Sequence, residues 1–150
     1  MSCQQKKKTM SRPLIIIAVA LSMGFLYACT KPYVHEGQEY GLEVTLYQCK
    51  PVFSNSQVRI CFDSLLSDSR CPANAVCVWQ GFAAGKFSLS ADGETYPFKL
   101  STVDLPGLFP KDTTISGYKI EFINLSPYPG TVPGPIPDNV RKAEVKVTKL

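Results

Sequence analysis

The chain has 150 residues, with 16 Lys and Arg against 12 Asp and Glu and a formal net charge of +4. The whole excess lies in a basic leader made of Lys6, Lys7, Lys8 and Arg12, and no acidic residue precedes Glu36. The remaining chain is therefore close to neutral and carries no basic stripe with interleaved aromatic residues, which argues against a nucleic-acid partner. Its length fits one domain with a hydrophobic core of its own.

An apolar run from Leu14 to Leu26 follows this leader, interrupted only by Ser22 and Gly24. Its 13 residues are too few for a membrane-spanning helix, which needs about 20. A basic start followed by a short apolar run is the layout of a secretory signal peptide. We therefore expect an N-terminal signal helix that is removed from the mature protein.

The run ends in Leu26-Tyr27-Ala28-Cys29, which resembles the lipobox of bacterial lipoproteins. The resemblance implies a diacylglycerol on the Cys29 thiol and cleavage just before it, which makes residues 1–28 a lipoprotein signal peptide. Two or more acyl chains anchor a protein stably, at about 0.8 kcal/mol for each buried methylene. The alternatives are an ordinary signal peptide that leaves Cys29 as a plain thiol, and a retained signal anchor.

Residues 29–38 then form a lipidated tether that contains the only histidine, His35. Thr30 stands where such lipoproteins carry a retention aspartate, and no acidic run follows that would suggest surface export. We therefore expect a protein of the bacterial cell envelope, bound to the outer membrane through lipid on Cys29 and facing the periplasm.

From residue 39 onward, apolar and polar residues alternate in short segments, which is the period of half-buried β-strands. Asp92-Gly93 between two such segments is a strong signal for a tight hairpin. The pattern predicts an all-β domain over residues 39–150, either a single antiparallel β-sandwich, immunoglobulin-like, or a small barrel. The segments are 42–47, 58–62, 82–90, 96–100, 115–125 and 142–148, with proline-containing loops at 103–112 and 126–139.

The longest predicted strand, 115–125, shows how parity assigns side chains to the core. Tyr118, Ile120 and Phe122 share one face of this strand. Ile123 and Leu125 fall on the opposite face. This arrangement predicts that the end of the strand is buried on both sides.

Four cysteines remain after the lipid anchor, namely Cys49, Cys61, Cys71 and Cys77. An even number in an exported chain indicates disulfides, and three pairings are possible. We expect the local pairs Cys49–Cys61 and Cys71–Cys77, the first bridging neighbouring strands on the outer face because both residues have the parity opposite to the core. A zinc site is the alternative, but five residues separate Cys71 from Cys77 and no histidine lies near them. We therefore expect no metal and no cofactor.

Residues 68–81 read Asp-Ser-Arg-Cys-Pro-Ala-Asn-Ala-Val-Cys-Val-Trp-Gln-Gly. The segments Asp-Ser-Arg-Cys-Pro and Cys-Val-Trp-x-Gly resemble a signature of small bacterial lipoproteins of unknown function, which implies no catalytic residues. From the residues alone, the motif predicts a disulfide-closed loop in which Trp79 packs beside the disulfide and Asp68 caps the turn or pairs with Arg70. The alternative is that Arg70, Asn74 and Trp79 face a ligand.

No arrangement of residues argues for catalysis, so we predict that the protein is not an enzyme. His35 lies in the tether, cysteine thiols are oxidised in this compartment, and the acidic residues form no recognisable motif, although a pair of carboxylates in a hydrolase is still an alternative. We predict a membrane-anchored module with a binding or structural role towards an unknown protein or glycan, for example a glycan-binding or protease-inhibitor-like module. Tyr128, between Pro127 and Pro129, is a candidate anchor because prolines reduce the entropy lost on binding; a stiff connection is the alternative.

Two short segments suggest a modification. Asp63-Ser64-Leu65 and Asp112-Thr113-Thr114 resemble O-glycosylation sites used by some bacteria with such lipoproteins. Ser64 and Thr113 are therefore candidate sites, although matches of three residues also arise by chance.

Overall fold

The structure is a computed structural model and describes residues 37–54 and 56–150. The predicted signal peptide 1–28, Cys29 and most of the predicted tether lie outside the described residues. Within the described part, no helix is long and apolar enough to cross a membrane.

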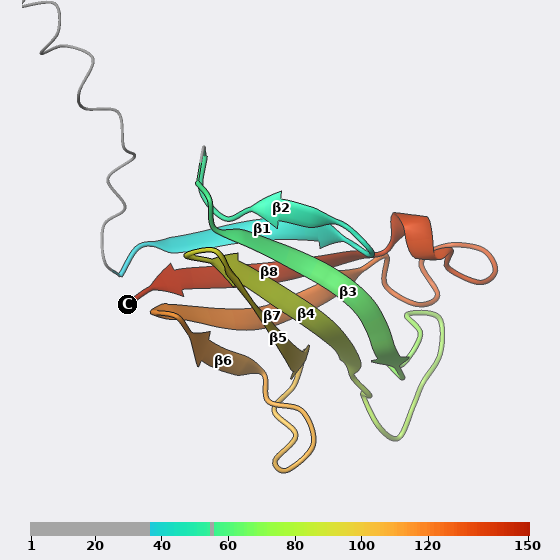
Figure 1. The fold of residues 1–150 in the computed structure, drawn as a ribbon. Helices are drawn as coiled ribbons and strands as arrows, with labels where there is room; N and C mark the ends of the chain where they lie inside the picture. Colours follow the sequence, from blue (N-terminus) through green and yellow to red (C-terminus); the bar gives the residue numbers. More distant parts are fainter. Residues whose placement is uncertain (1–36, 55) are drawn as a thin grey trace, which may run out of the picture. The chain divides into compact units, whose positions relative to one another are not determined.

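Eight strands form two antiparallel sheets of four, stacked as two layers (Figure 1). The predicted β-sandwich is confirmed, and the sheets do not close into a barrel. The first sheet has the order β1 (Glu39–Thr45), β8 (Lys142–Lys149), β7 (Tyr118–Ser126) and β6 (Asp112–Ile115). The second has the order β2 (Cys49–Pro51), β3 (Arg59–Asp68), β4 (Ala83–Ala91) and β5 (Glu94–Ser101), and a 3-10 turn, η1 (Asp138–Val140), precedes β8.

The strand order is that of a meander folded into two layers. Strands β2 to β5 are neighbours in chain order in the second sheet, and β6 to β8 are neighbours in the first, where β1 pairs with β8. The chain changes sheet between β1 and β2 and between β5 and β6. This order differs from that of an immunoglobulin sheet, in which the second strand is a neighbour of the fifth. The backbone N–H of Gly37 also donates to the carbonyl of Lys149 at 2.8 Å, so the first and last strands hold each other.

The core lies between the layers and follows the predicted parity. Phe62, Phe87 and Phe122 are fully buried, and the ring of Phe87 lies 4.9 Å from that of Phe62 and 5.2 Å from that of Phe122. Burying three aromatic side chains from both sheets is a major source of stability in a domain of this size. Other predicted inward positions are also buried, among them Val44, Ile60, Leu100, Ile120, Ala143, Val145 and Val147.

Two tight turns share one geometry, although the sequence indicated only the first. Asp92 and Gly93 have φ values of 53° and 83°, which confirms the predicted hairpin. Ser116 and Gly117 have φ values of 49° and 76° and divide the predicted strand 115–125 into β6 and β7. Two successive residues with positive φ make the hairpin turn whose twist matches that of the strands. The prediction of one long strand was therefore wrong.

A β-bulge corrects the burial predicted for the end of β7. The register against β8 shifts between Phe122 and Asn124, so one extra residue enters the strand. Leu125 thereby turns into the core and is fully buried, whereas Ile123 is 37% exposed. The strand end is not buried on both sides, because the bulge changes the parity.

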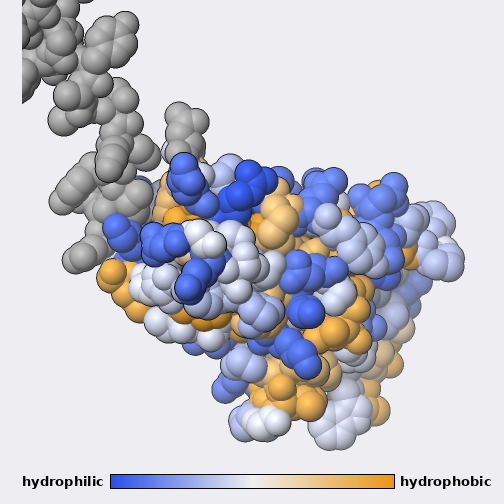
Figure 2. All heavy atoms as spheres, in the orientation of Figure 1, coloured by the Kyte–Doolittle hydropathy of each residue, from blue (hydrophilic) through white to orange (hydrophobic). Residues whose placement is uncertain are grey.

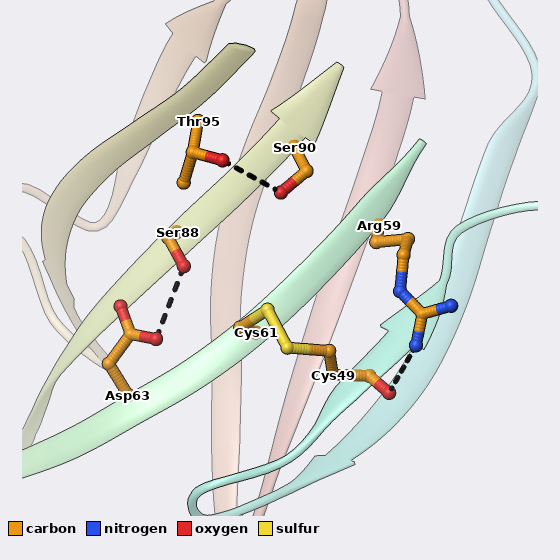
Figure 3. The surroundings of a disulfide bond; sticks show 7 residues. All are labelled: Cys49, Arg59, Cys61, Asp63, Ser88, Ser90 and Thr95. Atoms are coloured by element: carbon orange, nitrogen blue, oxygen red, sulfur yellow. Dashed lines mark hydrogen bonds between the residues drawn. A yellow bond between two sulfur atoms is a disulfide. The ribbon is translucent and has the colours of Figure 1, made fainter. Parts of the chain in front are cut away.

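Cys49 and Cys61 are directly opposite each other in β2 and β3 and form a disulfide, as expected (Figure 3). The bond lies on the outer face of the second sheet. The Arg59 side chain donates to the Cys49 carbonyl at 3.4 Å, and the Ser88 hydroxyl donates to the Asp63 carboxylate at 3.1 Å on the same face. The bridge fixes the three-residue edge strand β2 to the sheet.

Candidate interaction surface

The sandwich has two ends of different character (Figure 1). Gly37, the two tight turns and the C-terminal Leu150 lie at one end, which we call the tether end. Three longer loops, residues 69–82, 102–111 and 127–141, lie at the other, which we call the loop end.

Arg70 organises the loop end from a buried position. Its guanidinium group donates to both carboxylate oxygens of Asp68, from Nε at 2.7 Å and from Nη2 at 2.9 Å. It also donates to the carbonyls of Leu125 and Pro127 and lies 4.8 Å from the centre of the Tyr128 ring. The predicted pair with Asp68 is confirmed. The protein itself takes up these donors, and the residue is only 6% exposed.

Asp68 is held by a second cation. The Nη1 atom of Arg141, which lies just before β8, donates to the Asp68 carboxylate at 3.1 Å. Burial raises the pKa of Asp68, but the hydrogen bonds and charges of Arg70 and Arg141 outweigh it and hold the pKa below its ordinary value. Two segments distant in sequence are thus tied to the end of β3.

The two ends of the motif 68–81 continue the pairing of β3 with β4 for a short distance before the chain leaves the sheet. The Ser69 N–H donates to the Phe82 carbonyl and the Cys71 N–H to the Gln80 carbonyl, both at 2.9 Å. Gly81 has a φ of 69°, and a Cβ atom there would lie 1.8 Å from the Ser69 carbonyl oxygen. Only glycine fits where the two arms approach so closely.

Beyond this base, residues 70–81 form a projecting segment that we call the stapled loop, because the expected disulfide Cys71–Cys77 closes it. Its inner side packs on the proline-rich loop. The Ala73 N–H donates to the Pro129 carbonyl at 2.8 Å, and a Cβ atom on Gly130 would lie 2.6 Å from the side-chain oxygen of Asn74. The two segments singled out from sequence therefore form one unit.

The outer side of the stapled loop exposes large apolar residues. Val76 is fully exposed, Val78 is 94% exposed and Trp79 is 82% exposed. The prediction that Trp79 packs beside the disulfide was therefore wrong. The aromatic ring that packs on the motif is instead that of Tyr128, which covers Arg70 and is itself only half-exposed.

A hollow of about 440 Å³ runs between the stapled loop and the loop after β5. Apolar side chains of Trp79, Phe82, Val103 and Leu105 dominate its lining. A second hollow, with a more polar lining, shares Gln80, Gly81 and Val103 with the first, so the two form one depression that we call the loop-end groove. Figure 2 shows apolar residues gathered along the lower side of the molecule, where Figure 1 draws these two loops. The polar half also includes Arg70, Thr102, Asn124 and Tyr128.

The valines and the loop after β5 are the parts of this surface that sequence reasoning missed. A usable signal was present, because no charged residue occurs from Cys71 to Gly85 although the segment leaves the sheet. The candidate glycosylation residues lie elsewhere, Ser64 within β3 and Thr113 within β6, and both are half-buried.

Comparison with protein families, with curated proteins and with solved structures finds no match to this chain. In the part of the chain that the structure describes, no group of His, Cys, Asp and Glu side chains is placed to hold a metal ion. The groove is thus characterised by its own geometry, which is a depression with an apolar half and a polar half beside a disulfide-closed projecting loop.

Proposed function

We propose that the protein is an envelope lipoprotein, anchored to the outer membrane through lipid on Cys29, whose β-sandwich is a non-enzymatic binding module facing the periplasm. The observation that carries the proposal is the placement of the two ends. The chain reaches the domain at Gly37, at the tether end, and the exposed apolar residues of the stapled loop lie at the loop end. The point at which the chain enters the domain is therefore at the opposite end of the sandwich from these exposed residues.

The rigidity of the loop end supports a binding role. The disulfide, the ion pairs of Asp68 and the contact between the stapled and proline-rich loops fix this surface before any partner arrives. A surface ordered in advance loses less conformational entropy when it binds. Apolar residues that this framework holds in water are typical of an interaction site rather than of a structural loop.

The anchor is tested by Cys29→Ser, with Cys3→Ser as the matched control in the same leader. We expect incorporation of labelled palmitate and fractionation with outer membranes for the wild type and for Cys3→Ser. For Cys29→Ser we expect no label. Labelling of Cys29→Ser, or an intact mass without acyl chains for the native protein, would contradict the anchor.

The binding role is tested by a photo-crosslinking residue in the intact cell. Placed at Val78, it should give a discrete adduct with one envelope component that mass spectrometry identifies. Placed at Glu144, which is exposed in β8 on the outer face of the first sheet, it should give none. Equal adducts from both positions would show that the loop end is not a preferred contact.

A further inference from the structure

Apart from Arg70 at its start, the stapled loop carries no charged residue. Between Cys71 and Gly85 no Asp, Glu, Lys or Arg occurs, and the guanidinium group of Arg70 is neutralised by Asp68. Arg70, paired with Asp68, is the one charged side chain in the groove lining. The lining therefore offers little attraction to acidic lipid headgroups or polyanionic polymers, whose binding depends on unpaired basic side chains. An occupant that complements this surface is itself uncharged where it makes contact.

The shape of the loop-end groove favours a protein segment over a small molecule. Its apolar half has the volume of a ligand site, about 440 Å³, but it is shallow and open between two loops. Small-molecule sites bury most of the surface of their ligand, which an open depression does not do. Side chains projecting from a peptide, in contrast, fill such a depression while their backbone stays outside.

The lining supplies both kinds of contact that a peptide needs. Trp79, Val103 and Leu105 offer apolar surface for a side chain. Beside them, the exposed amide group of Gln80 can donate to and accept from a peptide backbone. The side-chain oxygen of Asn124 accepts from the Leu125 N–H at 2.9 Å, and the NH2 group of Asn124 can donate. One aromatic ring with aliphatic neighbours provides a site for an apolar side chain.

We propose that the loop-end groove binds an uncharged, extended segment of a partner protein, which inserts an aliphatic or aromatic side chain beside Trp79. This inference rests on the binding role proposed above and names the chemistry of the partner.

Trp79 provides the readout, because it is the only tryptophan in the chain. Its indole is exposed in the free protein, so an occupant that covers it shifts the fluorescence emission to shorter wavelength. The probe is a random dodecapeptide library selected against the full lipidated protein in phosphatidylcholine nanodiscs, followed by titration of a selected peptide that lacks tryptophan. We expect selected sequences rich in apolar residues and poor in charge, with a saturable blue shift.

Variants that keep Trp79 localise the binding. Val103→Ser and Leu105→Ala alter the apolar half of the groove, and each should weaken the peptide about tenfold. Tyr47→Ala is the matched control, because Tyr47 is 67% exposed at the loop end but does not line the groove. It should leave the affinity within about twofold. Near-ultraviolet circular dichroism confirms that each variant keeps the native fold.

Several outcomes would overturn the inference. Selected peptides that are rich in charge, or that bind all three variants equally well, would place the interaction elsewhere. A blue shift that appears when the concentration of the protein alone is raised would mean that a second copy occupies the groove. A blue shift on adding phosphatidylcholine vesicles would mean that a membrane does. A blue shift on adding oligosaccharides would mean that a glycan does. The fluorescence does not depend on the acyl chains, so a failed anchor at Cys29 would be recognised separately.

Discussion

Asp68 is the residue on which the loop end depends, because two guanidinium groups from distant parts of the chain meet at its carboxylate. The Asp68 side chain is 10% exposed, that of Arg70 is 4% exposed and that of Arg141 is 16% exposed. A buried charge that loses its partner keeps the cost of its desolvation without the compensating attraction. The carboxylate therefore stabilises the fold chiefly because it compensates the buried charges of Arg70 and Arg141.

We expect Asp68→Asn to lower the free energy of unfolding by about 3 kcal/mol, since it removes the carboxylate that both guanidinium groups share and leaves Arg141 with only Asp138 at 3.4 Å. Urea denaturation at neutral pH measures the change. The matched control is Asp112→Asn, because the ion pair of Asp112 with Lys119 is 46% exposed on both sides and should contribute less than about 1 kcal/mol. Equal effects of the two substitutions would contradict the role given to Asp68.

The ion pairs of Asp68 also predict that the stability of the protein depends on pH. The pKa of Asp68 is lowered in the folded state, so its contribution to stability is fully present above the pKa of an unfolded aspartate, about 3.9. The contribution is lost as the pH falls through the lower pKa of the folded state. Urea midpoints measured from pH 7 to pH 2 should therefore fall below about pH 4 in the wild type. The fall should be smaller in Asp68→Asn, and parallel curves for the two proteins would exclude the linkage.

Trp79 should contribute little to folding, in spite of its size. We expect Trp79→Ala to change the free energy of unfolding by less than about 0.5 kcal/mol, because the side chain is 82% exposed. Phe87→Ala, which empties a fully buried site, should cost about 3–5 kcal/mol. Chemical denaturation compares the two, and acrylamide should quench the emission of Trp79 in the native protein. Protection from acrylamide until the protein unfolds would contradict the exposed position.

At the scale of elements, the base of the stapled loop depends on the close approach of its two arms. Gly81→Ala places a methyl group against the Ser69 carbonyl in addition to forcing alanine into a left-handed conformation. Gly107→Ala isolates the second effect, because Gly107 has a φ of 77° and no atom lies within 4 Å of an added Cβ.

We expect Gly107→Ala to cost about 1–2 kcal/mol of unfolding free energy, and Gly81→Ala about 1–3 kcal/mol more. Thermal unfolding followed by circular dichroism compares the two variants. Similar melting temperatures for both would show that the two arms separate more easily than the structure implies.

The sequence predicted those elements whose signals are local. Alternation of apolar and polar residues identified the inner and outer faces of β1, β3 and β8, and the pair Asp92-Gly93 predicted the turn between β4 and β5. Ser116-Gly117 escaped notice because alternation continues on both sides of it, and the bulge in β7 escaped because a single extra residue has no composition of its own.

In the candidate site, too, the local features were predicted and the long-range contacts were not. The pair Asp68–Arg70 and the disulfide Cys71–Cys77 are local, and both were predicted. The cover of Arg70 by Tyr128 joins residues 58 positions apart, so no local pattern reveals it.

At the scale of the whole molecule, the leader and the domain differ in charge. The four basic residues in excess all precede Cys29, and the rest of the chain has 12 basic and 12 acidic residues. Ion pairs join many of these charges across the outer face of the first sheet, such as Lys146 with Glu39 and Glu121. Positive and negative side chains therefore alternate on the surface of the domain, and their balance leaves no strong electrostatic field that would attract a polyelectrolyte.

Cleavage before Cys29 should therefore change the isoelectric point. The 150-residue chain has an isoelectric point of about 8.7, and we expect the processed protein to focus close to neutrality. Isoelectric focusing of the native protein, beside a Cys29→Ser precursor that retains its leader, measures the difference. A native protein that focuses with the precursor would show that the leader is not removed.

The pairing of β1 with β8 has a mechanical consequence. A partner held at the loop end and a lipid held in the membrane would pull on the domain from opposite ends, and the pull would reach it through β1. The seven register pairs between Glu39 and Thr45 on β1 and their partners on β8 lie across this line of force. They would be loaded together in shear rather than opened one after another, so the strand that receives the tether is also the one best placed to resist being torn from its sheet.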